Sequence, residues 1–244
     1  MRLAIPGLAA LLAIGVGTQA GRAAEVVQPD VIVDITRARP THRLVETSRL
    51  ELAYGDAPGA IGFEPAGDER RANGPDAFEV DARGDYIVAD PVHRVLLRVA
   101  LRSKVPVVSE IGALPLRGEA PAAFSSAVRV TKCNAEAGLV SVAPGGKQIQ
   151  VEVGGPLASI RLIGVSTAGD IFLIVERFIK RGKLAVDRQV VVLDSSGALK
   201  ALLQVRDKPA VHPGRDFVLG PKGTLHRMVP GTQAVAFVRF EVRP

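Results

Sequence analysis

The chain has little of what marks several large classes of protein. Its 244 residues include one cysteine, no tryptophan and only 4% aromatic residues. A single cysteine cannot form an intramolecular disulfide, which excludes a disulfide-stapled miniprotein. Hydrophobic residues make up 47% of the chain, too many for a disordered or collagen-like polypeptide. Because aromatics are scarce, we expect a core built mostly of valine, leucine, isoleucine and alanine.

Long apolar runs are absent except at the N-terminus. There, Arg2 precedes an apolar run from Leu3 to about Val16, and small residues follow it up to Ala23. This order of charge, apolar run and small residues is typical of a secretory signal peptide. The run is shorter than the roughly 20 residues needed to span a bilayer, and no lipidation signal follows it. The alternative is an uncleaved membrane anchor.

We therefore predict a signal peptide over residues 1–23 and a single mature domain over residues 24–244. The mature chain is expected to be periplasmic or secreted, with no stable membrane anchor after cleavage. Its formal charge of +6 includes Arg2 and Arg22 of the leader, and the remaining basic residues are scattered along the chain. A nucleic-acid-binding protein concentrates its positive charge, so nucleic acid is not an expected partner.

The mature sequence predicts short β-strands joined by glycine turns. β-Branched and alternating apolar residues favour strands over residues 31–36, 50–54, 171–178, 190–193 and 199–205, with Lys180–Lys183 in the connection between the strands at 171–178 and 190–193. Residues 55–74 form a long glycine-rich loop. Residues 74–99 break into three strands at 77–80, 85–89 and 94–99. The first two are separated by Asp81–Gly84, a turn in which glycine adopts positive φ and the aspartate bonds nearby amides.

Residues 74–99 resemble a blade of the NHL-like β-propellers. The matching residues, in chain order, are Pro75, Phe78, Val80-Asp81, Gly84-Asp85, Tyr86–Asp90 and His93-Arg94-Val95. Weaker echoes at 163–175 and 217–229 repeat the strand, turn and strand, with turn glycines Gly169 and Gly223. The resemblance implies an all-β fold, a small or irregular β-propeller of about five blades. A β-sandwich, or a β protein that merely shares this turn chemistry, is the alternative.

Residues that could carry chemistry are few. The four histidines, His42, His93, His212 and His226, are far apart in the sequence and show no metal-ligand spacing. We expect His93 to serve in a turn and His226 to lie on a half-exposed strand face. Cys133 has no local signature of a nucleophile and is interpreted as a structural thiol. The aspartates beside predicted turns are also interpreted as structural: Asp81, Asp90, Asp170, Asp194 and Asp216.

Two function hypotheses follow, of which the first needs no cofactor and the second needs a divalent ion. The first is an exported, non-enzymatic protein that binds another protein and assists a periplasmic enzyme system. Its predicted contact is loop 55–74, with Phe63, Arg70 and Arg71. The second follows from the resemblance to propellers of the lactonase type, which hold Ca²⁺ or another divalent ion on channel carboxylates. No ordered ligand set aligns with this chain. A small-ligand sensor domain is a third possibility.

Overall fold

The structure is a computed structural model that describes residues 29–57, 59–68, 70–101, 105–114, 130–134, 139–142, 147–181, 183–206 and 209–244. The predicted leader, residues 1–23, lies outside these ranges. The described residues form strands β1 to β16 and contain no helix, which confirms the all-β prediction. Accordingly, this part of the chain has no helix able to cross a membrane.

The strands form four sheets of four strands each. The first sheet contains β3 (Ala77–Val80), β4 (Tyr86–Asp90), β5 (Val95–Ala100) and β6 (Val107–Ala113). The second contains β1 (Val31–Asp34), β9 (Lys147–Glu152), β8 (Leu139–Val142) and β7 (Val130–Asn134). The third contains β10 (Leu157–Val165), β11 (Ile171–Arg181), β12 (Lys183–Leu193) and β13 (Leu199–Val205). The fourth contains β14 (Phe217–Leu219), β15 (Leu225–Pro230), β16 (Ala234–Arg243) and β2 (Arg43–Ala53).

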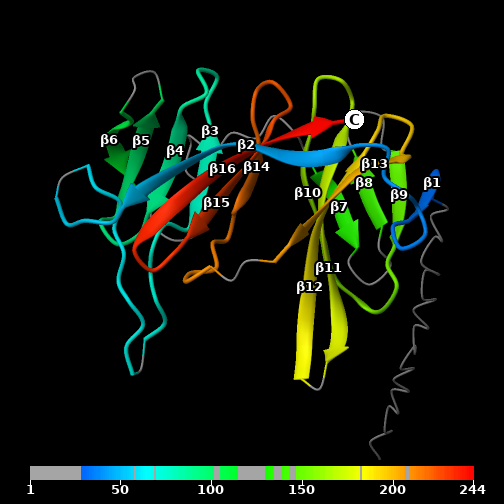
Figure 1. The fold of residues 1–244 in the computed structure, drawn as a ribbon, viewed down its shortest axis with the longest axis horizontal. Coiled ribbons are helices and arrows are strands. Elements are labelled where there is room, and N and C mark those ends of the chain that lie inside the picture. Colours follow the sequence, from blue (N-terminus) through cyan, green and yellow to red (C-terminus); the bar gives the residue numbers. More distant parts are fainter. Residues whose placement is uncertain are drawn as a thin grey trace, which may run out of the picture.

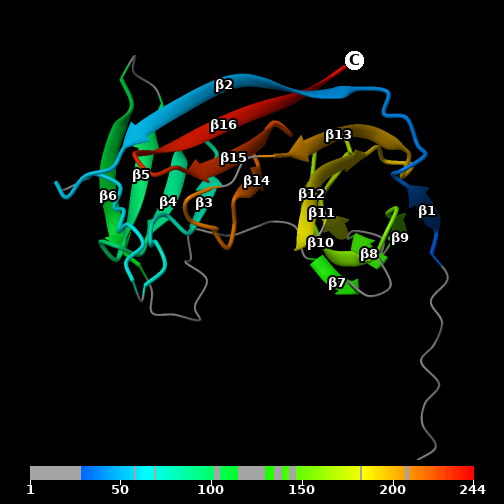
Figure 2. The same ribbon diagram turned by 60° about the horizontal axis from the view of Figure 1, so that its bottom comes forward.

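Two sheets are completed by strands from the start of the chain. β1 pairs in parallel with β9, and β2 pairs antiparallel with β16 along almost its whole length. All other strand pairs are antiparallel neighbours in sequence. β2 also contacts β13 of the third sheet, so it links two sheets as it runs along the molecule (Figure 2). The two N-terminal strands therefore complete sheets that later parts of the chain form.

The sheets lie in a row in the order second, third, fourth, first (Figure 1). A hydrophobic cluster fills each of the three spaces between neighbouring sheets. The third sheet is consequently buried on both faces. On β11, Leu173 and Val175 face the second sheet, whereas Phe172 and Ile174 face the fourth. This explains the unbroken apolar run of residues 171–175, which a sheet covered on one face would not need.

The three strands predicted within residues 74–99 are present, each within one residue of its expected bounds. β5 begins at Val95 because Arg94 has a φ of 61°, which is incompatible with a strand. Gly84 has a φ of 87°, and the carboxylate of Asp81 accepts bonds from the backbone amides of Arg83 and Asp85, at 2.8 and 3.0 Å. The turn is thus built as its residue types suggest.

The number and arrangement of sheets differ from the expectation of about five blades. Four sheets are present in the described residues, because β1 and β2 complete sheets formed by later strands and add none of their own. The row has two ends, and three separate cores lie between its sheets. A simple sandwich would have one core between two sheets.

The β11–β12 hairpin is longer than predicted. The sequence suggested strands over 171–178 and 190–193 with a loop containing Lys180–Lys183, but pairing continues to Arg181 opposite Lys183. The two strands extend beyond their neighbours and project from the body of the molecule (Figure 1). The composition of residues 180–183 is typical of a loop, although Arg181 and Lys183 are paired within the hairpin.

Candidate functional site

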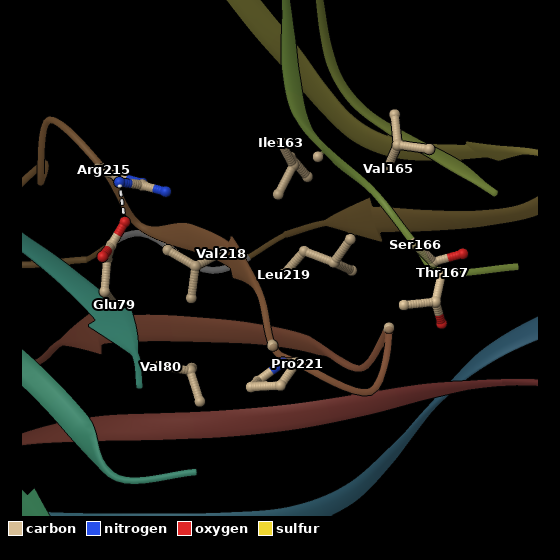
Figure 3. A pocket seen from close by; sticks show the side chains of 13 residues that line it. Glu79, Val80, Ile163, Val165, Ser166, Thr167, Arg215, Val218, Leu219 and Pro221 are labelled. Carbon is tan, nitrogen blue, oxygen red and sulfur yellow. Dashed lines mark hydrogen bonds and ion pairs between the residues drawn. The ribbon is translucent and has the colours of Figure 1, made fainter. Parts of the chain in front are cut away.

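A pocket of about 270 Å³ lies where three sheets meet along their first strands (Figure 3). β3 contributes Glu79 and Val80, the end of β10 and the turn after it contribute residues 163–167, and the segment around β14 contributes Arg215 and residues 218–221. Apolar side chains line its middle: Val80, Ile163, Val165, Val218 and Leu219. The pocket therefore combines an apolar wall with polar groups at its two sides, the usual composition of a small-molecule site.

One side of the pocket carries an ion pair. Nη1 of Arg215 lies 2.8 Å from Oε1 of Glu79 (Figure 3). Burial raises the pKa of the Glu79 carboxyl, and the positive charge and hydrogen bond of Arg215 oppose that rise. The pair joins the first sheet to the strand segment before β14, so its first role is to hold the two elements together.

The other side of the pocket is formed by two turns. The backbone amide of Asp170 donates to Oγ of Ser166, at 3.0 Å, which closes the turn between β10 and β11. Gly223, with a φ of 72°, packs the β14–β15 turn against Ser166 so closely that an added Cβ would lie 3.0 Å from the serine Cβ. The predicted turn residue Gly223 thus lines the pocket as well as shaping the turn.

A second pocket of about 460 Å³ shares Ser166, Thr167 and Gly223 with the first. Its charged side chains include two ion pairs, Lys200 with Asp170 at 2.7 Å and Arg239 with Glu241 at 3.0 Å. Charges that are already satisfied within the protein give an incoming ligand little to bind. Both pockets can hold a small molecule by shape, and the second is lined by Thr224, whose hydroxyl lies 2.8 Å from Nε2 of His226.

His226 lies on β15 and is 6% exposed, so the prediction that it lies on a half-exposed strand face is wrong. Its Nδ1 is 3.1 Å from the hydroxyl of Tyr86, and its Nε2 is 2.8 Å from that of Thr224. Burial, and to a lesser degree the charge of Arg239, lowers the pKa of His226 to about 4. The ring is therefore neutral at physiological pH and bonded on both nitrogens. It is buried because residues 225–228 face cores on both sides of β15.

His93 and His42 each bond a residue close to them in the sequence. Nδ1 of His93 bonds the buried carboxylate of Asp90 at 2.8 Å within one turn, and His42 bonds the neighbouring Thr41 hydroxyl. Cys133 lies on β7, and its side chain is outside the described part of the structure. Within the described residues, no three His, Cys, Asp or Glu side chains are grouped so that they could hold a metal ion. No carboxylate set of the kind expected for Ca²⁺ can therefore be assigned there.

The aspartates interpreted as structural are bonded within the protein. Asp194 accepts bonds from Ser196 and Ala198 in its turn. These bonds lower the pKa of the Asp194 carboxyl, and the bond from the Ser196 side chain has the largest effect. Asp216 has a different role from the turn position expected of it. It is 2% exposed and forms a double hydrogen bond with Arg188 of β12, at 2.6 Å for each bond. Asp216 therefore joins the third and fourth sheets.

The predicted contact residues of loop 55–74 are distributed over a small structure. Glu64 and Asn73 form an antiparallel bridge, with exposed Arg70 and Arg71 between them. Phe63 stacks on Tyr54, with ring centroids 4.7 Å apart, and is half-buried. The loop thus exposes Arg70 and Arg71 to solvent, while Phe63 packs against Tyr54.

Two exposed apolar surfaces were missed in the sequence. The first is the free edge of the first sheet, where Val107 and Ile111 of β6 are 56% and 42% exposed, together with Leu101 and Val105 before the strand. The second is at the projecting end of the β11–β12 hairpin, where Phe178 and Val186 are 38% and 52% exposed. Apolar residues at such positions look like ordinary strand residues in a sequence, because only the fold shows which strands remain uncovered.

Searches of protein-family models, of curated proteins and of solved structures found no match to this chain.

Proposed function

We propose that the mature chain is an exported, non-enzymatic protein that binds a partner protein and serves as an accessory factor for an enzyme system in the same compartment. The observation that carries this proposal is the exposed apolar edge of the first sheet. β6 is the terminal strand of its sheet, and its Val107 and Ile111 are exposed. Soluble proteins usually protect such an edge with charge, proline or a covering segment.

The geometry of β6 favours addition of a strand from the partner. Residues 107–110 pair regularly with β5, whereas a register shift between Leu96 and Leu97 produces a bulge around Ile111. A partner strand could therefore hydrogen-bond to the regular part and cover Val107, with Ile111 beside it. Backbone bonds would supply affinity in this mode, and the flanking apolar side chains would supply specificity.

A photo-crosslinking amino acid at position 107, in the cells that export the protein, tests this proposal. We expect a discrete adduct with another protein. The matched control is position 48, an exposed polar residue on β2, which is the terminal strand of the fourth sheet. Equal adducts at both positions, or none at position 107, would contradict binding at the β6 edge.

Export itself is supported by the order of charge, apolar run and small residues in 1–23. N-terminal sequencing of the exported protein should begin near Ala24. Recovery of the chain with Met1 intact in a membrane fraction would contradict cleavage of residues 1–23.

We further propose that the four sheets are blades of an irregular, NHL-like propeller with four blades instead of five. The order of the sheets along the chain supports this proposal. The first sheet precedes the second in sequence, yet they lie at opposite ends of the row (Figure 1). Closing the row into a ring would make these two ends neighbours, so that chain order and spatial order agree. Spin labels on Cys133 and on an Ala82→Cys variant should then be closer together than the open row allows.

A further inference from the structure

The second pocket, of about 460 Å³, has an excess of positive charge around it. Three basic side chains line it, Lys200, Lys222 and Arg239, against two acidic ones, Asp170 and Glu241. The ion pairs of Lys200 with Asp170 and of Arg239 with Glu241 use both acidic groups. Within the described residues Lys222, which is exposed in the β14–β15 turn, has no acidic partner. The pocket therefore keeps a basic group that its own residues do not neutralise.

Two further arginines flank this pocket, at the start of β2 and the end of β16. Glu241 bonds two arginines, because its Oε1 lies 3.0 Å from Nη2 of Arg239 and its Oε2 lies 3.2 Å from Nη2 of Arg243. Arg43 lies directly opposite Arg243 in the β2–β16 pairing, and both are exposed. Like charges that are directly opposite on neighbouring strands repel each other. Even with a carboxylate at Pro244, which also lines the pocket, basic groups remain in excess.

Hydroxyl groups line the side of the pocket that the two turns form. Ser166 and Thr167 line both pockets, and Figure 3 shows them at the end of the first pocket opposite to Arg215. Oγ of Ser166 accepts the backbone amide of Asp170 at 3.0 Å, so the hydrogen of this hydroxyl remains to be donated. The turns thus offer hydrogen-bond donors beside the excess positive charge.

The hydroxyl of Thr224 is a donor as well, because of the buried residues behind it. Burial raises the pKa of Tyr86 to about 12, so its hydroxyl keeps its hydrogen at neutral pH. Within the described residues this hydroxyl has one partner, Nδ1 of His226 at 3.1 Å, and a buried O–H without an acceptor is costly. Tyr86 therefore donates to Nδ1, and the neutral ring of His226 donates its single hydrogen from Nε2 to Oγ1 of Thr224, at 2.8 Å. Thr224 lines the pocket and keeps its own hydrogen for a ligand.

From this arrangement we propose that the second pocket binds the phosphate group of a small molecule. A phosphate monoester has a charge of about −1.5 to −2 at neutral pH and three strong acceptor oxygens. The ammonium group of Lys222 pairs with that charge, and the hydroxyls of Ser166 and Thr224 donate to the oxygens. Arg43 and Arg243 attract the anion from the edge of the pocket.

The size of the pocket agrees with such a ligand. Its volume of about 460 Å³ has room for a phosphate with a small organic group attached. A single carboxylate would bring less charge and fewer acceptor oxygens, and would leave some of the basic and hydroxyl groups without a partner. This inference goes beyond the proposed function and does not depend on the β6 edge.

Calorimetric titration of the mature chain with inorganic phosphate and with glycerol 3-phosphate tests the charges. We expect both to bind and glycerol not to bind. Lys222→Gln should bind both phosphates at least about tenfold more weakly, since it removes a charge-assisted bond. Arg43→Gln/Arg243→Gln should bind about threefold more weakly at low salt, and the difference should disappear as salt is added. Arg70→Gln/Arg71→Gln, which removes two exposed arginines of loop 55–74, is the matched control and should bind like the wild type.

Variants of Thr224 test the hydroxyl donor. Thr224→Val keeps the shape of the side chain and should bind about tenfold more weakly, whereas Thr224→Ser keeps the hydroxyl and should bind like the wild type. Nitrogen NMR of the wild type should show the His226 ring protonated on Nε2, with His226→Gln to assign the signal. Thr224→Val also removes the acceptor of a buried N–H, so its fold is checked by thermal melting. Lys222→Gln changes an exposed residue and tests the site whether or not Thr224→Val folds.

Four outcomes would overturn the proposal. The first two are the absence of wild-type binding to either phosphate, and equal affinity of Lys222→Gln and the wild type. The third is tighter binding of malonate than of inorganic phosphate, which would assign the pocket to a dicarboxylate. The fourth is a His226 ring protonated on Nδ1, because Thr224 would then donate to the ring and not to the ligand. Adducts at position 107 report on a different surface, so failure here is distinguishable from failure of the proposed function.

Discussion

At the scale of single residues, the turn glycines differ in why a side chain is excluded. Gly84 has a φ of 87°, yet nothing lies within 4 Å of the place where its Cβ would stand. At Gly169 an added Cβ would lie 3.0 Å from the Cβ of Ser195 in the next turn, in addition to a φ of 84°. Only backbone strain therefore opposes substitution at Gly84, whereas both strain and contact oppose it at Gly169.

Replacement of Gly84 by valine should destabilise the protein by about 1–3 kcal/mol, the usual cost of forcing a side chain into a special backbone conformation. Arg83→Ala should change the free energy of unfolding by less than about 0.5 kcal/mol, because Arg83 is exposed and bonds Asp81 through its backbone. Urea unfolding of both variants measures the difference. A larger loss in Arg83→Ala than in Gly84→Val would show that the turn is placed wrongly.

His226 should make stability depend on pH. The pKa of its ring is about 4 in the folded chain against 6.5 for the free side chain, so between these values the unfolded chain binds the extra proton. Stability should therefore be greatest above pH 6.5 and fall as the pH drops from 6.5 to 4. Between pH 7 and pH 5 the contribution of this residue is about 2 kcal/mol.

His226→Gln, which does not titrate, is the variant that isolates this effect. Urea unfolding at pH 7 and pH 5 should show a smaller loss of stability in the variant than in the wild type. An identical loss in both would mean that the ring is protonated in the folded protein, which contradicts its burial beside Tyr86.

At the scale of elements, the contact between the third and fourth sheets depends on Asp216. Its carboxylate, 3% exposed, receives two 2.6 Å bonds from Arg188 on β12. The ring of Phe217 has the guanidinium groups of Arg188 and Arg227 at 5.4 and 5.0 Å from its centroid. These groups close the end of the core between the two sheets, where apolar side chains give way to charged ones.

Asp216→Asn keeps the shape of the side chain but removes its charge. We expect a loss of about 2 kcal/mol, since Asp216 is buried and loses charge-assisted bonds, while Arg188 keeps its ion pair with Glu176 at 3.1 Å. The matched control is Glu46→Gln, whose pair with Arg49 has both side chains more than 40% exposed. That variant should lose less than about 1 kcal/mol. Equal losses in thermal or urea unfolding would contradict a structural role for the Asp216 pair.

Local patterns predict individual strands well in this chain. β3, β4, β5 and β13 lie within one residue of their expected positions, because turn glycines and alternating residues mark their ends. The pairing of β2 with β16 and of β1 with β9 could not be predicted, since each joins segments at distant positions and depends on which edges remain open after the other strands pair. β6 was missed for a related reason. Its residues lack a regular alternation, and a bulge interrupts its pairing.

At the scale of the whole molecule, four small sheets in a row place most of the apolar residues in three cores and leave a few exposed at the edges. The pocket between β3, β10 and β14 was not visible in the sequence, because its residues come from three sheets. The turn residue Gly223 was identified from its local pattern, but its place beside Ser166 depends on packing between sheets. A site built from residues of several sheets can be identified only when the fold is known.

The central claim is that the edge of the first sheet binds a partner protein. Its most direct measurement is calorimetric titration of the purified protein captured at position 107 into the mature wild-type chain and two variants. Val107→Lys/Ile111→Lys places charges on the exposed edge, and Ile32→Lys places one on a 60% exposed residue of β1 as a control. We expect the β6 variant to bind at least about tenfold more weakly, because lysine blocks strand addition at an edge, and the control to bind like the wild type. Equal affinity of all three proteins would contradict the claim.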